Sequence, residues 1–149
     1  MTERVTMNIT ENFTFAEFEA SPIAKEKGIA NVISSFEVRD SVVALVREVL
    51  QPLRGLYGKP MKVNSGYRSP ELNKAVGGVA TSQHCKGEAA DIATGSAAES
   101  YRLAKLAKEN GIPYDQCILY PTFVHFSHKL NGEQRHTILY NSSYRGKKL

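Results

Sequence analysis

The chain has 149 residues, of which 42% are hydrophobic and 23% charged, which is typical of a single globular domain spanning residues 1–149. The sequence holds no run of about 18 apolar residues, which excludes a membrane-spanning helix. The net charge of +4 is modest and no nucleic-acid-binding motif accompanies it, so we expect no nucleic-acid partner.

The two ends of the chain are predicted to be peripheral to this domain. Residues 1–11 are polar and expected to be mobile, and they lack the apolar core of a signal peptide, so we expect synthesis in the cytoplasm. Residues 141–149 form a basic tail, which can associate loosely with a polyanion such as an anionic cell wall. We expect the protein to be a monomer.

The first third of the chain is predicted to be helical. Thr14 and Glu17 have the spacing of a capping box, which predicts a short helix start. From Ser34 or Ser35 onward, apolar residues recur every three or four positions up to Leu53, which predicts an amphipathic helix with a kink near Pro52.

The remainder is predicted to be mainly strands. The order along the chain is a strand over 61–64, a turn over 65–70, a short helix to residue 76, a loop over 79–87, a strand over 88–92, a helix over 97–109 and strands over 117–120, 123–127 and 137–140. Helices followed by a small, mainly antiparallel sheet with one interposed helix predict an α+β fold.

Two histidines and one aspartate form a candidate metal site. In the strand 88–92, alternation places Asp91 on the same face as the small residues Gly87 and Ala89, and His84 lies in the loop just before. His125 lies in the strand 123–127, so the three side chains converge if the two strands are neighbours. Two imidazoles and a carboxylate are a common ligand set for one catalytic zinc ion (Zn2+) per chain, with a fourth position open.

The two cysteines and the remaining two histidines show no comparable sign of a metal site. Cys85 and Cys117 are predicted to be free thiols, because they do not form a CxxC pair. Cys85 directly follows a candidate ligand and is expected to face away from the metal. We expect His128 and His136 to lie on the surface.

Three segments together resemble the zinc D-Ala-D-Ala carboxypeptidase family of peptidoglycan peptidases, which shares a fold with the hedgehog signalling domain. They are Ser65-Gly66-Tyr67-Arg68-Ser69, Ser82-Gln83-His84 with Gly87, Ala89 and Asp91, and Val124-His125-Phe126-Ser127. The resemblance covers residues 12–140 and is greatest to the short members without a signal peptide found in phages, which include endolysins that cut L-alanyl-D-glutamate bonds.

This resemblance implies a hedgehog/DD-peptidase-like fold and a role for each matching residue. His84, Asp91 and His125 would bind zinc, Arg68 would bind or polarise the substrate's carboxylate or scissile carbonyl, and Ser82 would contact the substrate. It also implies action on peptidoglycan stem peptides at the bacterial cell wall, which the protein would reach from the cytoplasm by the release route of phage endolysins.

One expected residue is missing. The family usually provides a carboxylate shortly before the second zinc histidine as the general base, but residues 119–124 contain none, and Tyr120 stands there. Tyr120 could donate a proton or bind the oxyanion, or else Asp115, Glu133 or His128 could reach the metal. Alternatively, the site binds zinc without hydrolysing a peptide.

The leading hypothesis is therefore a zinc metallopeptidase, a D,D-carboxypeptidase or an L,D-type endopeptidase, that hydrolyses peptidoglycan stem peptides or crosslinks. The second is a catalytically silent zinc domain that binds cell-wall peptide or a protein partner. A third is a purely structural zinc site, which predicts unfolding on chelation.

Overall fold

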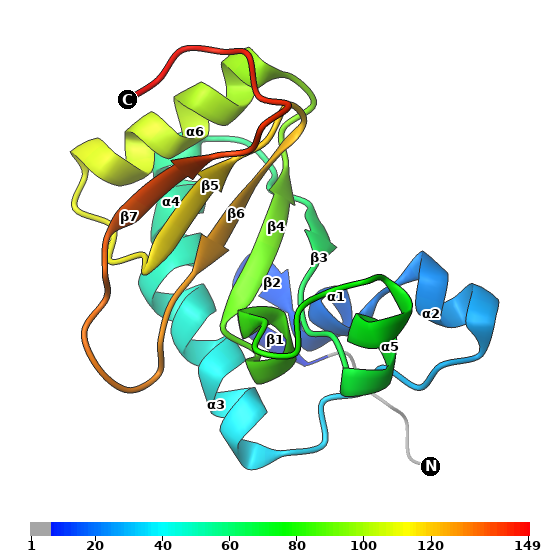
Figure 1. Cartoon of the computed structure of the whole chain (residues 1–149). Helices are drawn as coiled ribbons and strands as arrows, with labels where there is room; N and C mark the ends of the chain where they lie inside the picture. Colours follow the sequence, from blue (N-terminus) through cyan, green and yellow to red (C-terminus); the bar gives the residue numbers. More distant parts are fainter. Residues whose placement is uncertain (1–6) are drawn as a thin grey trace.

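A five-stranded sheet of order β3-β4-β6-β5-β7 forms the centre of the computed structural model, which describes residues 7–149 (Figure 1). Neighbouring strands are antiparallel, except that β5 and β7 are parallel. The strands of this sheet are β3 (Val63–Ser65), β4 (Ala89–Ala93), β5 (Gln116–Leu119), β6 (Phe123–Ser127) and β7 (Thr137–Tyr140). A separate small sheet pairs β1 (Asn8–Thr10) with β2 (Phe13–Thr14).

The helical segments up to α4 precede the five-stranded sheet in the chain, whereas α5, η2 and α6 lie between its strands. The helical segments are α1 (Phe15–Glu19), α2 (Pro22–Lys27), α3 (Phe36–Leu45), the π-helical η1 (Val46–Leu50), α4 (Gln51–Tyr57), α5 (Pro70–Ala75), the 3₁₀ turn η2 (Gln83–Lys86) and α6 (Ala97–Glu109). The α+β class is confirmed. The predicted capping box is present, because Thr14 and Glu17 each bond the other's backbone amide.

The predicted kink near Pro52 takes the form of a π-helical segment. Pro52 lies in the first turn of α4, where it lacks the amide hydrogen that would bond one turn back. The hydrogen-bond register widens in η1 directly before it, as is typical of a π-bulge inside a longer helix. The helix then ends at Gly58, which adopts a left-handed conformation.

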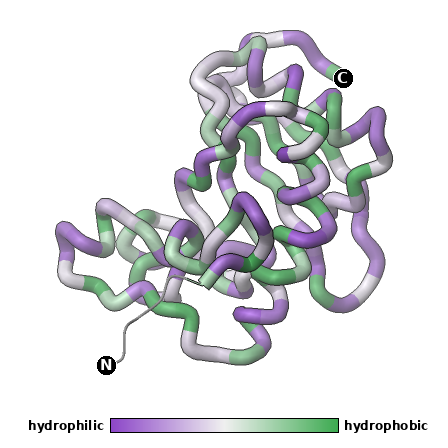
Figure 2. Tube along the Cα trace, turned by 180° about the vertical axis from the view of Figure 1, so that it is seen from behind, coloured by the Kyte–Doolittle hydropathy of each residue, from purple (hydrophilic) through white to green (hydrophobic). Residues whose placement is uncertain are grey.

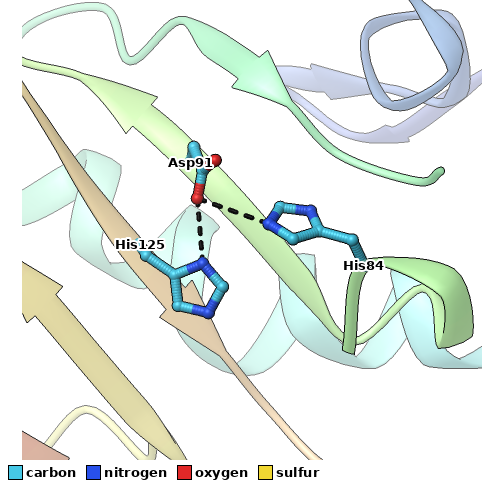
Figure 3. A group of neighbouring side chains, drawn as sticks. All are labelled: His84, Asp91 and His125. Carbon is cyan, nitrogen blue, oxygen red and sulfur yellow. Dashed lines mark hydrogen bonds and ion pairs between the residues drawn. The ribbon is translucent and has the colours of Figure 1, made fainter. Parts of the chain in front are cut away.

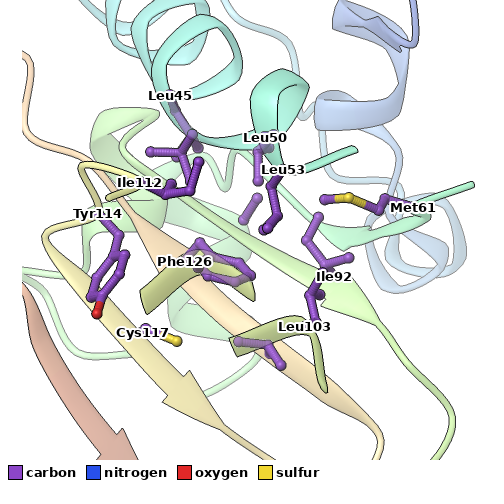
Figure 4. Close-up of a cluster of buried hydrophobic side chains, with 14 of the residues drawn as sticks. Leu45, Leu50, Leu53, Met61, Ile92, Leu103, Ile112, Tyr114, Cys117 and Phe126 are labelled. Carbon is purple, nitrogen blue, oxygen red and sulfur yellow. The ribbon is translucent and has the colours of Figure 1, made fainter. Parts of the chain in front are cut away.

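The hydrophobic core lies on one face of the five-stranded sheet, where α3, η1, α4 and α6 pack (Figures 1 and 4). Ile92, Phe126 and Leu103 are fully buried there, from β4, β6 and α6 respectively. Cys117 is also fully buried and unpaired. Because this face holds the apolar residues of β4 and β6, the alternate residues of these strands face the other side.

Both ends of the described chain contact the domain. Within the segment 1–11 that is expected to be mobile, Asn8–Thr10 form β1, because their backbone pairs with β2. Residues 1–6 lie outside the described residues. The basic tail packs on the domain, since Tyr144 is buried and its ring stacks on Tyr140 at 5.6 Å between centroids.

Within residues 7–149, no helix has the length and apolar character needed to cross a membrane. Seen from behind, the hydrophobic stretches along the chain are short and interrupted by hydrophilic residues (Figure 2).

Candidate metal centre

His84 is presented by a short turn rather than by an irregular loop. Residues 83–86 form η2, in which the hydroxyl of Ser82 accepts a hydrogen bond from the His84 amide at 3.2 Å. Gly87 ends the turn in a left-handed conformation (φ 75°), and a Cβ there would lie 2.7 Å from the carbonyl oxygen of Val38. Glycine at this position therefore lets the turn pack against α3 and places His84 beside β4.

Asp91 and His125 lie opposite each other on neighbouring strands. The strands β4 and β6 pair in the register Asp91↔His125, so the condition on which the convergence of the three side chains depends is met. Directly opposed residues of an antiparallel pair have Cβ atoms about 4.5–5.5 Å apart on the same face, which brings the two side chains into contact.

The three side chains meet above this face (Figure 3). Asp91 Oδ1 lies 2.9 Å from His125 Nδ1 and 3.5 Å from His84 Nε2. One ligand atom from each residue lies within 4.8 Å of the others, and within residues 7–149 they form the one such cluster of three. The structure thus brings together the predicted ligands; binding of zinc by them remains a prediction.

The hydrogen bonds around the cluster fit a metal site. His84 Nδ1 lies 2.7 Å from the carbonyl oxygen of Gly66, which can only accept, so this nitrogen donates the hydrogen bond and Nε2 is directed toward Asp91. Metal-binding histidines are commonly oriented by such a bond from their other nitrogen.

The carboxylate of Asp91 is held in its charged form. Burial opposes ionisation and is the largest single effect, but the hydrogen bonds from His125 and His84 together outweigh it, so the pKa of Asp91 lies well below its usual range. A charged, partly buried carboxylate beside two imidazoles is a donor set that suits Zn²⁺.

Arg68 lies beside the cluster in the loop between β3 and α5. Its amide donates to the His84 carbonyl at 3.1 Å, and its Nη1 donates to Asn73 Oδ1 at 3.2 Å. Its Nε is buried and has no hydrogen-bond partner among the described residues. A buried donor without a partner is costly, so Arg68 holds an unsatisfied polar group beside the cluster.

Two buried asparagines fix this arginine. Asn31 bonds the two residues on either side of Arg68 in the chain. Its Nδ2 donates to the Tyr67 carbonyl at 2.9 Å, and its Oδ1 accepts from the Ser69 amide at 2.7 Å. Asn73 Nδ2 donates to the Val79 carbonyl at 2.8 Å, which orients its oxygen toward Arg68. Asn31 therefore fixes the backbone at Arg68, and Asn73 fixes the guanidinium.

These asparagines were missed in the sequence. The signal for Asn73 is its position within α5, because asparagine is unfavourable inside a helix unless its side chain has a specific partner. Asn31 lies in a connecting segment, where polar residues are ordinary and carry no signal.

The cluster opens into two clefts that share Arg68 and Asp91. One, of about 490 Å³, extends toward α2 and α5 and includes Pro22, Tyr67 and Leu72. The other, of about 470 Å³, extends across the sheet; its lining residues are Arg68, Gly78, Val79, Thr81, Ser82, Gln83, His84, Asp91, Gln116, Ile118, Tyr120, His125 and Arg135. We call this second one the sheet cleft. An extended peptide therefore has space on both sides of the cluster.

Of the four groups considered as a replacement for the missing carboxylate, Tyr120 is the one that lines the sheet cleft. Its ring stacks on Phe123 at 4.1 Å between centroids. Burial and then the charge of Asp91 raise the pKa of Tyr120, although Arg68 opposes this, so the phenol keeps its proton at neutral pH and is a hydrogen-bond donor.

The other three groups lie outside both clefts. Asp115 is fully buried and its oxygens bind Arg135, and Glu133 is exposed. The expectation that His128 is a surface residue is wrong: it is buried, and mainly this burial lowers its pKa. His136 is exposed, as expected.

Cys85 faces away from the metal cluster. It lines a different pocket, together with Val38 of α3 and Leu130. The expectation was right, although it assumed an extended segment and Cys85 lies within the 3₁₀ turn.

Comparison with known proteins agrees with this geometry. Residues 11–128, which hold the whole cluster, match the family described as peptidase M15. The chain belongs to the peptidase M15 family. This membership confirms the predicted hedgehog/DD-peptidase-like fold.

Among curated members, the chain is similar to the zinc D-Ala-D-Ala carboxypeptidase of Streptomyces albus G, with 31% identity over 125 residues. The match covers 83% of this chain and 47% of that protein, so the chain spans about half the length of this M15 relative.

Proposed function

We propose that this M15 peptidase is a zinc-dependent enzyme that hydrolyses peptide bonds in peptidoglycan stem peptides or crosslinks. The observation that carries the proposal is the cluster of His84, Asp91 and His125, whose three ligand atoms lie within 4.8 Å of one another at the floor of the sheet cleft. The name of the Streptomyces relative, which specifies zinc and D-Ala-D-Ala, supports the choice of metal and substrate.

His84 Nε2, Asp91 and His125 Nδ1 would hold one zinc ion per chain. Zinc in such a site polarises a carbonyl and activates water near neutral pH. The bond from His84 to the Gly66 carbonyl orients one ligand, and pairing of β4 with β6 orients the other two.

The chain's own polar groups would position the substrate around this centre. Arg68, which lines the sheet cleft, would present its guanidinium charge to a carboxylate or to the carbonyl being attacked. Tyr120, which also lines the sheet cleft, would donate a hydrogen bond to the developing oxyanion, and Ser82 would contact the peptide backbone.

The proposal is tested by zinc content and by cleavage of purified muropeptides. Wild type should bind one zinc per chain and cleave, whereas His84→Ala should lose both. Zinc binding without cleavage of any stem peptide would contradict the enzyme and favour the alternative, a silent zinc domain that binds cell-wall peptide; titration calorimetry with the same muropeptides would then detect binding.

Two substitutions at position 120 distinguish a Tyr120 that takes part in catalysis from a site that has only lost its general base. If Tyr120 stabilises the oxyanion, Tyr120→Phe should lower kcat by about 10²-fold or more, and Tyr120→Glu should also lower it. If the site has merely lost its base, Tyr120→Phe should change little and Tyr120→Glu should raise kcat.

Endolysin-type release from the cytoplasm to the wall, and a monomeric state, belong to the same proposal. They are supported by the resemblance to short phage members. Light scattering would test the monomer, and lysis of cells only when a pore-forming protein is coexpressed would test the release route.

A further inference from the structure

The sheet cleft is lined by more positively charged than negatively charged side chains. The cleft contains two guanidinium groups, Arg68 and Arg135, whereas its carboxylate is Asp91 of the metal cluster. With Asp91 engaged by a metal, the cleft presents positive charge to an incoming peptide. Arg68 belongs to the site already described, but nothing so far explains why a second arginine lines the cleft.

The order of the strands places the two arginines on opposite sides of the cluster. Arg68 follows β3 at one edge of the sheet, and Arg135 precedes β7 at the other. The strand registers align Asp91 with His125, and His125 with Ile118 of β5. The cleft floor therefore continues from the cluster over β5 toward Arg135.

Arg135 is held rigidly in this position. Its Nε and Nη2 bond the two oxygens of the buried Asp115, at 3.0 Å to Oδ1 and 2.6 Å to Oδ2, and its own amide donates to Oδ1 at 2.8 Å. Gln83, the neighbour of His84, donates to the same carboxylate at 3.3 Å. The hydrogen bonds among the described residues do not use Nη1 of Arg135, and its side chain is 49% exposed.

We propose that Arg135 binds a second negative charge of the substrate, on the far side of the scissile bond from Arg68. The inference rests on the proposed peptidase function and narrows its substrate to a peptide that is acidic on the Arg135 side. From β6 to β7 there are two strand spacings, about 10 Å, which an extended peptide covers in about three residues. Because Arg135 precedes β7 and is also displaced along the strands from Leu139, which aligns with His125 through Ile118, the recognised carboxylate lies at least about three residues from the bond that is cut.

A simpler role for Arg135 is to neutralise Asp115. This role predicts that substitutions of Arg135 lower stability and affect all substrates alike. Recognition of a substrate charge predicts instead that the effect depends on whether the substrate carries that charge, which a structural role would not produce.

The experiment uses matched peptides that carry either glutamate or glutamine at each of the four positions on either side of the cleaved bond. These are tested on the zinc-loaded wild type, Arg135→Gln, Arg135→Lys and the control Lys129→Gln, since Lys129 lies 3.9 Å from Asp115 but does not line the cleft. For one position, wild type should prefer glutamate roughly tenfold in kcat/KM, mainly through KM. Arg135→Gln should abolish that preference, and Arg135→Lys and Lys129→Gln should retain most of it.

Binding of the same peptides to the zinc-loaded wild type and Arg135→Gln, measured by calorimetry, keeps the inference testable if no peptide is cut. A glutamate preference in Kd that Arg135→Gln removes would support charge recognition, even with the peptidase proposal contradicted. Equal Kd and kcat/KM for glutamate and glutamine peptides in wild type would overturn the inference, and so would a preference that survives in Arg135→Gln.

Discussion

At the scale of single residues, the candidate site depends on how Arg68 is held. Asn73 bonds its guanidinium and is itself anchored to the Val79 carbonyl. Gly78 must lack a side chain, because a Cβ there would lie 2.0 Å from Asn73 Oδ1 and 2.9 Å from Arg68 Nη1. Asn73 is thus a positioning residue, which acts through Arg68 rather than on the substrate.

Asn73→Leu is expected to lower kcat/KM about tenfold, because the guanidinium loses its fixed direction, and to lower the free energy of unfolding by about 1–3 kcal/mol. Asn73→Asp keeps the oxygen that Arg68 bonds and should retain more activity. In an Arg68→Ala background, Asn73→Leu should no longer affect kcat/KM. An unchanged tenfold loss in that background would show that Asn73 does not act through Arg68.

The ion pair between the buried Asp115 and the half-exposed Arg135 predicts a specific acid sensitivity. Burial alone would raise the pKa of Asp115, but the bonds from Arg135 lower it from 3.8 to about 2. Because the pKa is lower in the folded state, the stabilisation is fully present above pH 3.8 and is lost as the pH falls toward 2. Since Arg135 is exposed to solvent, we expect a contribution of only about 1 kcal/mol.

Urea unfolding of wild type and Asp115→Asn should therefore differ by about 1 kcal/mol at pH 7, and by less at pH 3. The exposed Asp40 provides a control, and Asp40→Asn should change the free energy of unfolding by less than about 0.5 kcal/mol at either pH. A difference for Asp115→Asn that grows toward pH 3 would contradict the assigned role of the pair.

At the scale of elements, the loop after β3 connects the N-terminal helices to the metal cluster. The Gly66 carbonyl bonds His84 Nδ1, and a Cβ on Gly66 would lie 2.6 Å from the Phe18 ring and 2.8 Å from its Cα. Because Phe18 is fully buried in α1, the loop backbone would have to move, and the carbonyl that orients His84 would move with it.

Gly66→Ala is expected to weaken zinc binding by about tenfold or more and to destabilise the fold by about 1–3 kcal/mol. Gly55→Ala in α4 is the matched control, since a Cβ there meets nothing within 4 Å, and it should leave zinc affinity unchanged. Competition with a chromogenic chelator measures both. Equal zinc affinity in Gly66→Ala and wild type would contradict a role for this carbonyl.

The elements themselves were largely predictable because their signals are local. The spacing of Thr14 and Glu17 and the alternation of residues 123–127 each depend on a few neighbouring residues, and both predictions are confirmed. The convergence of His84, Asp91 and His125 was predictable once β4 and β6 were assumed to be neighbours. The positions of Asn31 and Arg135 depend on contacts between distant segments, which no local pattern reports. Asn73 instead bonds Arg68 and Val79, which are close in the chain, and its place inside α5 is a local signal.

At the scale of the whole molecule, the core does not depend on the metal. The buried hydrophobic cluster lies between the helices and one face of the sheet, and His84, Asp91 and His125 are not part of it. The fold should therefore survive without zinc, unlike a domain that folds only around its metal.

Chelation should accordingly abolish peptide cleavage before it affects structure. We expect unchanged far-UV circular dichroism at 25 °C in excess EDTA, with a cooperative unfolding transition at a Tm lowered by the lost binding energy. Readdition of zinc should restore the Tm. Loss of secondary structure on chelation at 25 °C would instead favour the structural zinc site.

A crystal structure of the zinc-loaded protein, with anomalous diffraction measured at the zinc edge, tests the central claim most directly. We predict one anomalous peak, bound by His84 Nε2, Asp91 and His125 Nδ1 at about 2.0–2.2 Å, with a water or substrate atom in the fourth position. A peak elsewhere, or a fourth protein ligand that closes the site, would contradict it.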